Sequence, residues 1–446
     1  MIDAMNRRQF VAGAAAAGGS ILGANDRVLV GLVGCGGRGR YVARFMKEAP
    51  NVEFTAVCDV YETNRNSARE WAGPNARAYA DFRKMLEQRD LDAVLVSTPE
   101  HWHAYVAVAA LQAGKDVYVE KPLAHNVREG RAIVTAARKY KRIAQAGTQH
   151  RSAPHFPEVA EIIQSGKLGE VRFVRVWNYS NMFPNGIGRH PDSEPPAGLD
   201  WDMYCGPAPL RPFNRSRFLG SFRWFWDYAG GTITDFGTHR FDTVHQIMGV
   251  DKPKTVSASG GRFSLKDAGE MPDVIQATFE YPGFIMSYEA SSINGRGIGG
   301  QTPGMRYYNA RGKEDQPHGM AFYGTNGTIV AERIGYEIFP EPWGGPFNRS
   351  AQTGERIERK QLNVADATGI HAKNFIESVR SRKPPIADIE AGHRATLIGH
   401  LGNIAYKVGR KLTWDAEKEE FAGDPRRTSC SPAPPAPPGS CSAPAR

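Results

Sequence analysis

Residues 27–39 (RVLVGLVGCGGRG) constrain the fold of this chain more than any other stretch. The apolar run 28–33 is long enough for a buried parallel strand. It leads directly into Gly34, Gly36, Gly37, Arg38 and Gly39, which fit the pattern G-x-G-x-x-G. Glycines at these places allow a tight turn, close approach of the backbone to a pyrophosphate, and close packing of a helix on the strand. The helix predicted at 41–48 would point its first N–H groups at the phosphates.

Asp59 strengthens this interpretation. It ends a second strand-like run, 53–58, about 20 residues after Gly39, where an acidic residue binds the ribose hydroxyls of an NAD-type cofactor. An acid at this place favours NAD over NADP, because it would repel a 2′-phosphate. Arg38 and Arg65 keep NADP open, since either could pair with that phosphate.

Composition narrows the class of protein. A chain of 446 residues predicts two or three domains, and 41% hydrophobic with 23% charged residues is typical of a globular protein. The net charge of +9 is spread along the chain without a Lys/Arg block, so nucleic-acid binding has little support. The five cysteines have neither metal-ligand spacing nor a disulfide framework, and we expect no metal site.

The two ends of the chain are predicted to lie outside the fold. Within residues 1–24, Arg7 and Arg8 precede an Ala/Gly-rich apolar stretch, as in a twin-arginine export signal, although a disordered basic tail would also fit. We therefore expect export of the folded protein to the periplasm and no membrane span once the signal is removed. Residues 423–446 are rich in Pro, Ala and Ser and are predicted to be disordered.

Residues 25–148 are predicted to form a nucleotide-binding α/β domain. Strand-like runs alternate with helix-length segments, which indicates βαβ units and a doubly wound parallel sheet. Ligands of such sheets lie beyond the carboxyl ends of the strands. Two segments fall there, one containing Thr98, Pro99 and His103 and the other Glu120 and Lys121.

A change of pattern marks a second α/β domain at 149–422. Residues 170–178 alternate apolar and polar, as in an antiparallel strand with one buried face. Further strands are expected at 255–264, 273–281 and 284–291. The pair 321–324 and 328–332 is predicted to form a hairpin across Asn326-Gly327. Helices are predicted at 156–165, 369–381 and 390–409.

Four motifs together resemble the glucose–fructose oxidoreductase/inositol dehydrogenase (Gfo/Idh/MocA) family. They are the loop 34–39, the segment 97–103, residues 114–122 with Glu120-Lys121-Pro122, and residues 230–242 (GGTITDFGTHRFD). The resemblance covers about residues 27–412 and implies a Rossmann domain followed by an α/β domain with a large, open, mostly antiparallel sheet. That sheet often mediates oligomerisation, so a homodimer or homotetramer is expected. The implied chemistry is NAD(P)-dependent oxidation or reduction of sugars and cyclitols, with a small-molecule substrate as partner.

The segment 230–242 also has a pattern of its own. Asp235, His239 and Asp242 stand at i, i+4 and i+7, which places them on one face of a predicted helix. Thr232 or Thr234 would cap that helix. Its opposite face, with Phe241, Val244 and Met248, would be buried.

These residues suit the oxidation of a secondary alcohol. His239 is the expected general base, with Asp235 orienting it or sharing the proton. The Lys121 ammonium would stabilise the developing alkoxide. By the resemblance, Glu120, Pro99 and His103 would line the nicotinamide ribose, and Thr98 and Gln149 complete the expected cofactor contacts.

The substrate wall is expected from the second domain. His150 lies at the predicted crevice between the domains, Arg223 could hold hydroxyls or a carboxylate, and Trp226 belongs to a segment rich in tryptophan. With Lys121, Asp235 and His239 these residues form the predicted substrate-binding set. For any single tryptophan, including Trp177, Trp201 and Trp224, packing in the core is an equal alternative.

Three functions compete at this point. The first is an exported sugar or cyclitol oxidoreductase with tightly bound NAD. The second is an NAD-dependent glycoside-cleaving enzyme, in which transient ring oxidation permits elimination at the glycosidic bond. The third is a sugar-binding protein without activity. The presence of Lys121, Asp235 and His239 together favours the first.

Overall fold

The computed structural model describes residues 27–296, 317–333, 335–343, 351–352, 357–361 and 367–423. The signal predicted at 1–24 and all but the first residue of the tail predicted at 423–446 lie outside these ranges. None of the described helices is both long and apolar enough to cross a membrane.

The first part of the chain forms a sheet of six parallel strands in the order β3-β2-β1-β4-β5-β6. Its strands are β1 (Val28–Val33), β2 (Val52–Cys58), β3 (Arg77–Tyr79), β4 (Ala93–Val96), β5 (Asp116–Glu120) and β6 (Ala144–Gly147). This is the doubly wound order expected of a dinucleotide-binding fold, with a crevice beyond the end of β1. The predicted fold class is confirmed.

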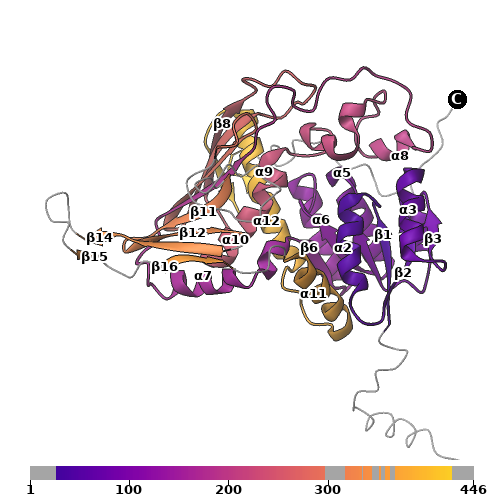
Figure 1. Cartoon of the computed structure of the whole chain (residues 1–446), viewed down its shortest axis with the longest axis horizontal. Coiled ribbons are helices and arrows are strands. Elements are labelled where there is room, and N and C mark those ends of the chain that lie inside the picture. The colour runs from indigo at the N-terminus through magenta and orange to yellow at the C-terminus, as the bar shows by residue number, and fades with distance from the viewer. Residues whose placement is uncertain are drawn as a thin grey trace, which may run out of the picture.

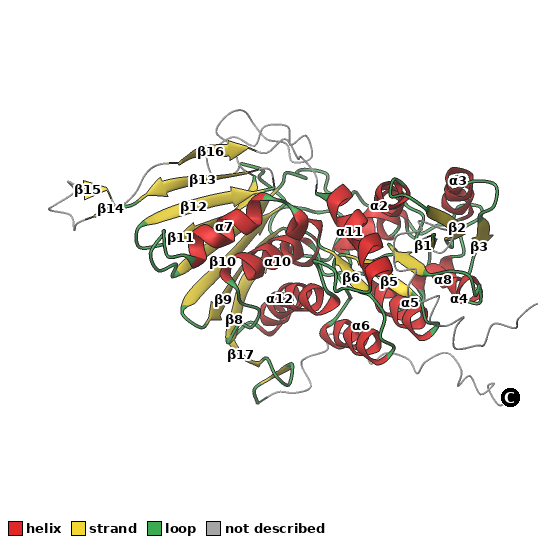
Figure 2. Cartoon of the chain, turned by 90° about the horizontal axis from the view of Figure 1, so that it is seen from below, coloured by secondary structure: helices red, strands yellow, loops and turns green. Residues whose placement is uncertain are grey.

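Helices cover both faces of this sheet (Figures 1 and 2). They are α2 (Gly37–Lys47), α3 (Glu62–Ala72), α4 (Phe82–Leu86), α5 (Glu100–Gln112) and α6 (Val127–Lys139). α2 begins inside the glycine-rich loop, earlier than the sequence predicted. At Gly39 a Cβ would lie 2.2 Å from Ser97 Oγ and 2.3 Å from Gly34 O, so only glycine permits this contact of helix and strand.

A helix from the far end of the sequence completes the first part. α11 (Thr368–Ser381) lies beside α2, and its Ala372, Phe375 and Ile376 share an apolar cluster with residues of β1 (Figure 2). The boundary predicted near residue 148 divides the sequence into two segments. However, α11 belongs to the second segment and packs on the sheet of the first.

The second sheet has ten strands in the order β16-β13-β12-β11-β7-β10-β9-β8-β17-β18. They are β7 (Phe173–Tyr179), β8 (Thr255–Gly261), β9 (Val274–Tyr281), β10 (Phe284–Ser291), β11 (His318–Tyr323), β12 (Gly327–Glu332), β13 (Gly335–Pro340), β16 (Ile357–Gln361), β17 (Leu412–Asp415) and β18 (Glu420–Phe421). The short β14 (Pro342–Trp343) and β15 (Ala351–Gln352) form a separate pair. α7 (His155–Gln164), α10 (Gly237–Met248) and α12 (Ile389–Val408) pack on one face of the large sheet (Figure 2).

The large sheet is mostly antiparallel, as predicted, and β11 and β12 form the expected hairpin. β7 is the exception, because it runs antiparallel to β11 but parallel to β10. The antiparallel strand predicted at 170–178 is therefore confirmed on the side of β11 but not on the side of β10. Alternation of apolar and polar residues shows which face is buried, and it carries no information about the direction of the neighbouring strand.

Residues 198–228, which we call the strap, lie over the carboxyl ends of the parallel strands (Figure 1). The strap contains α8 (Trp201–Cys205) and the 3-10 turns η3 (Arg215–Arg217) and η4 (Leu219–Trp224). Its aromatic residues form their own apolar cluster, which includes Trp201, Tyr204, Phe218 and Tyr228. A packed aromatic core explains why this segment is not a linker.

Candidate active site

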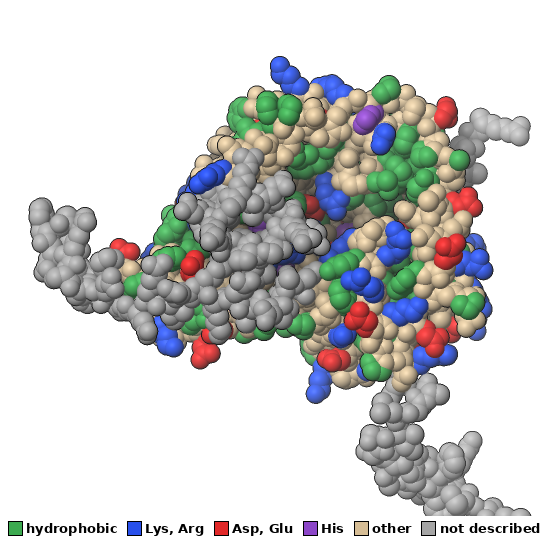
Figure 3. Space-filling model, viewed as in Figure 1, with side chains coloured by type: hydrophobic (Ala, Val, Ile, Leu, Met, Phe, Trp, Pro, Cys, Tyr) green, Lys and Arg blue, Asp and Glu red, His purple; other side chains and the backbone are tan. Residues whose placement is uncertain are grey.

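A cavity of about 850 Å³ lies between the carboxyl ends of the parallel strands, the strap and the start of α10. The space-filling view shows the surface hollowed between the two parts of the molecule, with charged and histidine side chains inside (Figure 3). Most of the predicted site residues line this cavity: Gly34, Gly36, Gly37, Arg38, Asp59, Thr98, Pro99, His103, Glu120, Lys121, Gln149, Arg223, Asp235 and His239. The volume is within the range of small-molecule and cofactor sites.

Lys121 and Asp235 form a buried ion pair in this cavity. Lys121 Nζ donates to Asp235 Oδ1 at 2.5 Å and to the Asp235 carbonyl oxygen at 2.9 Å, while Arg223 Nε lies 3.2 Å from Asp235 Oδ2. Burial opposes ionisation of Asp235, but Lys121 and Arg223 outweigh it and hold the pKa of Asp235 at about 2. Both carboxylate oxygens are thus engaged by cations. Asp235 orients Lys121, and the predicted pairing of Asp235 with His239 is wrong.

His239 lies in the same cavity as a neutral imidazole. Its ring stacks on that of His150 with the centroids 4.3 Å apart, and its Nδ1 is buried without a hydrogen-bond partner among the described residues. Burial, then the positive charges of Lys121 and Arg333, lower the pKa of His239 well below its ordinary value. The lowered pKa favours the neutral imidazole, the form that has a nitrogen lone pair for a substrate proton.

The helix predicted to carry both residues is broken in two. Asp235 ends α9 (Thr232–Asp235), Phe236 interrupts the helix, and His239 belongs to α10. The N-cap of α9 is Gly231 without a side-chain cap, so the capping predicted for Thr232 or Thr234 is wrong. Asp242 does not join Asp235 and His239. It forms a buried ion pair with Arg151, whose Nη2 lies 2.8 Å from Asp242 Oδ1.

The glycine-rich loop leaves room for a ligand. A Cβ added at Gly36 or at Gly37 would meet no atom within 4 Å, whereas at Gly34 (φ +86°) it would lie 2.5 Å from the Ser97 carbonyl carbon. Asp59 closes the loop, since its Oδ2 accepts from Cys35 N at 2.7 Å. This cradle fits the pyrophosphate of a dinucleotide.

The charges around the loop fit NAD better than NADP. Arg38 Nε is 2.9 Å from Glu120 Oε1, and Arg65 Nη1 donates to the Asp59 carbonyl oxygen at 2.8 Å. Both arginines that the sequence left open for a 2′-phosphate thus have protein partners. Thr98 Oγ1 and Gln149 Oε1 are buried without hydrogen-bond partners in the described part of the chain, so polar groups of a bound cofactor would find partners there.

Glu100 and Arg333 also line the cavity, and the sequence predicted no role for either of them. Glu100 begins α5 and is 2% exposed, and burial, then the nearby charge of Asp235, raises its pKa to about 8. The position of Glu100 within the segment 97–103 could have indicated a place at the cavity. A glutamate at the start of a helix is common, however, and by itself does not indicate a functional role. Arg333 follows β12, and nothing in the local sequence connects that strand with the cavity.

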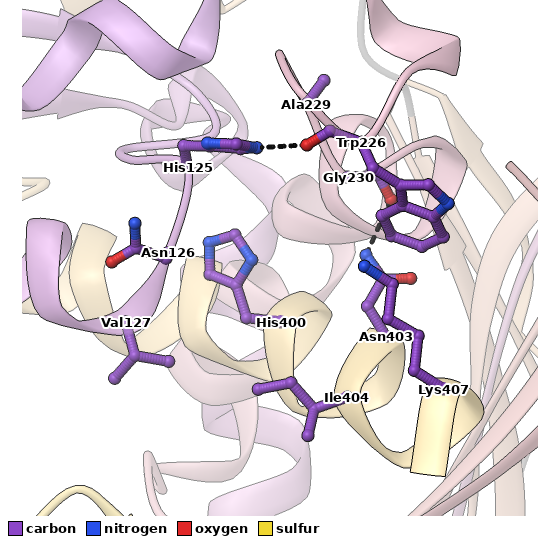
Figure 4. Close-up of a pocket in the computed structure, with 10 residues that line it drawn as sticks. All are labelled: His125, Asn126, Val127, Trp226, Ala229, Gly230, His400, Asn403, Ile404 and Lys407. Carbon is purple, nitrogen blue, oxygen red and sulfur yellow. Dashed lines mark hydrogen bonds between the residues drawn. The ribbon is translucent and has the colours of Figure 1, made fainter. Parts of the chain in front are cut away.

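Three predicted residues take other positions. Trp226 lines a separate cavity of about 40 Å³ with His125, His400, Asn403 and Lys407, so the predicted substrate contact of Trp226 is wrong (Figure 4). His150 stacks on His239 and is not among the residues that line the main cavity in the described structure, so its predicted substrate contact stays a prediction. Gly39 serves the packing of α2 on Ser97. Among the other tryptophans, Trp177 and Trp201 are buried and Trp224 lines the cavity.

The His103 side chain connects two loops of the site. Its Nδ1 is 2.8 Å from the Pro122 carbonyl oxygen and its Nε2 is 2.8 Å from that of Thr98. It therefore ties the loop after β4 to the loop after β5, which carries Lys121, while also lining the cavity.

Sequence comparisons agree with this architecture. The profile described as "Oxidoreductase family, NAD-binding Rossmann fold" matches residues 28–148. The profile described as "Oxidoreductase family, C-terminal alpha/beta domain" matches residues 158–271 and 351–432. The two profiles carry the same family designation and together cover most of the chain.

Individual relatives are distant. Myo-inositol 2-dehydrogenase of Thermotoga maritima is 23% identical over 391 residues, which span 86% of this chain and 97% of that enzyme. The uncharacterized oxidoreductase YrbE of Bacillus subtilis is 25% identical over 260 residues, 57% of this chain, and the match spans only 64% of that relative. A levoglucosan dehydrogenase in complex with NADH and levoglucosan superposes with a TM-score of 0.63 at 18% identity, over 87% of this chain and 99% of that structure, a likeness of fold.

Proposed function

Because the chain belongs to the Gfo/Idh/MocA oxidoreductase family, we propose that it transfers hydride between a secondary alcohol of a sugar, sugar derivative or cyclitol and bound NAD. One observation carries this proposal. The ammonium of Lys121, from the nucleotide-binding part, and the imidazole of His239, from the second part, line the same cavity as the glycine-rich loop. The names of the inositol and levoglucosan dehydrogenases among its relatives support polyhydroxylated substrates.

The side chains of the site have separate roles in alcohol oxidation. When bound, NAD supplies the hydride acceptor. His239, neutral at pH 7, accepts the proton of the substrate hydroxyl at a ring nitrogen. Lys121, held by Asp235, stabilises the alkoxide oxygen that remains, and in the reverse direction it polarises the carbonyl. Arg223 neutralises the second oxygen of Asp235, which keeps that carboxylate from accepting the substrate proton.

An absorbance assay tests this function. Purified protein loaded with NAD is mixed with myo-inositol, levoglucosan, common hexoses and their methyl glycosides, and reduced nicotinamide is followed at alkaline pH. Net reduction that disappears in Lys121→Ala and in His239→Ala supports the proposal. Release of nitrophenol from nitrophenyl glycosides without net reduction would favour the glycoside-cleaving alternative, and the absence of both reactions would refute oxidoreductase activity on sugars.

We also propose that the protein is exported by the twin-arginine pathway and works in the periplasm as a homo-oligomer. The pair Arg7-Arg8 before an Ala/Gly-rich stretch supports export, and the large open sheet offers a face for self-association. Replacing both arginines by lysine should retain the protein in the cytoplasm. Light scattering after size exclusion should give the mass of a dimer or tetramer, and a mass near 49.0 kDa would exclude self-association.

A further inference from the structure

The strap is fastened to the nucleotide-binding fold on one side of the glycine-rich loop by the segment after β2. Asp200 N donates to the Val60 carbonyl oxygen at 3.0 Å, and Glu62 N donates to the Gly198 carbonyl oxygen at 2.8 Å. The Phe218 ring lies edge-on to that of Tyr61, with centroids 5.6 Å apart. These contacts follow immediately after Asp59, at the place that binds ribose in this type of fold.

The second attachment lies at the start of α5, after β4. The indole Nε1 of Trp102 donates to the carbonyl oxygens of Met203 and Tyr204, both at 3.1 Å. α8 approaches so closely that a Cβ at Gly206 would lie 2.0 Å from the Trp102 ring. This contact is thus both hydrogen-bonded and tightly packed.

Strand order decides what lies beneath the strap. In the sheet β1 stands between β2 and β4, so the loop after β1, which is the glycine-rich loop, lies between the two attachments. The carboxyl ends of parallel strands share one edge of the sheet, and a dinucleotide bound there lies across that edge. The strap therefore crosses over the place that the dinucleotide would occupy.

The underside of the strap faces this space. Tyr204, Phe218, Leu219 and Arg223 line the same cavity as Gly36 and Gly37. Leu219 is 52% exposed and has a φ of +52°, an unfavourable conformation for a bulky L-residue. An exposed apolar side chain on such a backbone, at the wall of a cofactor cavity, is explained if a bound ligand covers it.

We propose that the strap retains the dinucleotide, which leaves only after the strap detaches from the segment after β2 or from α5. This inference rests on the proposed function, because it takes NAD as the ligand. It assigns Trp102 and Phe218 as residues that hold the strap closed while also lining the cavity, and Leu219 as a contact of the bound cofactor. Retention of this kind is what export of a folded, cofactor-loaded protein requires.

The test measures release of NADH from the full-length protein. Protein loaded with NADH is mixed with excess NAD, and the loss of bound NADH fluorescence gives the dissociation rate. Trp102→Phe keeps an aromatic ring against Phe82 but loses both hydrogen bonds, and we expect release about threefold to tenfold faster than in the wild type. Phe218→Ala, which loses the contact with Tyr61, should release NADH faster still.

Trp71→Phe is the matched control. Trp71 packs on Phe54 in the same part of the molecule and lies outside both the strap and the cavity lining, so release should match the wild type. Hydrogen exchange tests the proposal in the wild type, without any substitution. Bound NADH should slow exchange of the backbone amides in the strap, residues 198–228.

The two proposals fail in different ways. If NADH binds but Trp102→Phe and Phe218→Ala release it at the wild-type rate, or if exchange in the strap is the same with and without NADH, retention by the strap is wrong while the proposed function stands. If no dinucleotide binds to the folded wild-type protein, the proposed function is wrong and the role of the strap falls with it.

Discussion

Replacing Asp235 by asparagine tests the arrangement on which the active site depends. In the wild type, Asp235 is 6% exposed and its two oxygens contact Lys121 at 2.5 Å and Arg223 at 3.2 Å. Asparagine has nearly the same shape but no charge. The substitution therefore leaves two neighbouring cations without their shared anion while changing the packing little.

The size of the effect follows from the pKa of Asp235. A value of about 2 in the folded protein, against 3.8 ordinarily, corresponds to about 2 kcal/mol of stabilisation at pH 7. Because the folded-state pKa is the lower one, this contribution is complete above pH 4 and is lost as the pH falls from about 4 towards 2. Lys121 also loses its anchor, and displacement by about 1 Å of a group that contacts the reacting atoms costs roughly a hundredfold in rate.

Two assays check these numbers. Thermal unfolding at pH 7 should show a melting temperature about 2–4 °C lower in Asp235→Asn, and kcat for alcohol oxidation should fall about a hundredfold while NADH affinity changes little. The double variant Lys121→Met/Asp235→Asn should lose about 2 kcal/mol less free energy of unfolding than the sum of the losses in the two single variants. Additive losses, or a kcat within twofold of the wild type, would refute the coupling of Asp235 to Lys121.

Four further predictions follow from the geometry of the cavity. His239→Ala should abolish sugar oxidation with NADH binding, measured by fluorescence, preserved; normal turnover would mean that another group accepts the proton. Since its surroundings keep the pKa of His239 well below the ordinary value, the pH profile of wild-type kcat should show no inflection near pH 6.5, and an inflection there would contradict the lowered pKa. Gly36→Val should abolish NADH binding with little change in the melting temperature, because a Cβ there meets no protein atom within 4 Å and the side chain would extend into the space of the phosphates. Gly39→Ala should instead lower the melting temperature, by an overpacking cost of about 1–3 kcal/mol, because its Cβ would lie 2.2 Å from Ser97 Oγ; an unchanged melting temperature would contradict that close contact.

The parts of the fold that the sequence predicted correctly are local in origin. The run 28–33 and the glycines after it form a strand and a tight turn within residues 28–39, and each has a steric reason. Apolar periodicity likewise predicted most helices and strands, because burial of one face repeats with the period of the element. The hairpin of β11 and β12 followed from Asn326-Gly327, whose backbone freedom suits a tight turn.

Tertiary structure alone decided which side chains meet. Lys121 and Asp235 are 114 residues apart, and no periodicity links them, so their pairing, rather than that of Asp235 with His239, was visible only in the folded chain. Irregular segments posed the same problem, since Trp224 lines the cavity and Trp226, two residues later, lines another. The parallel pairing of β7 with β10 and the docking of α11 on β1 also join distant segments. Short-range sterics and burial patterns shape each element, but the partners of an element are selected by the packing of the whole molecule, which no local stretch of sequence contains.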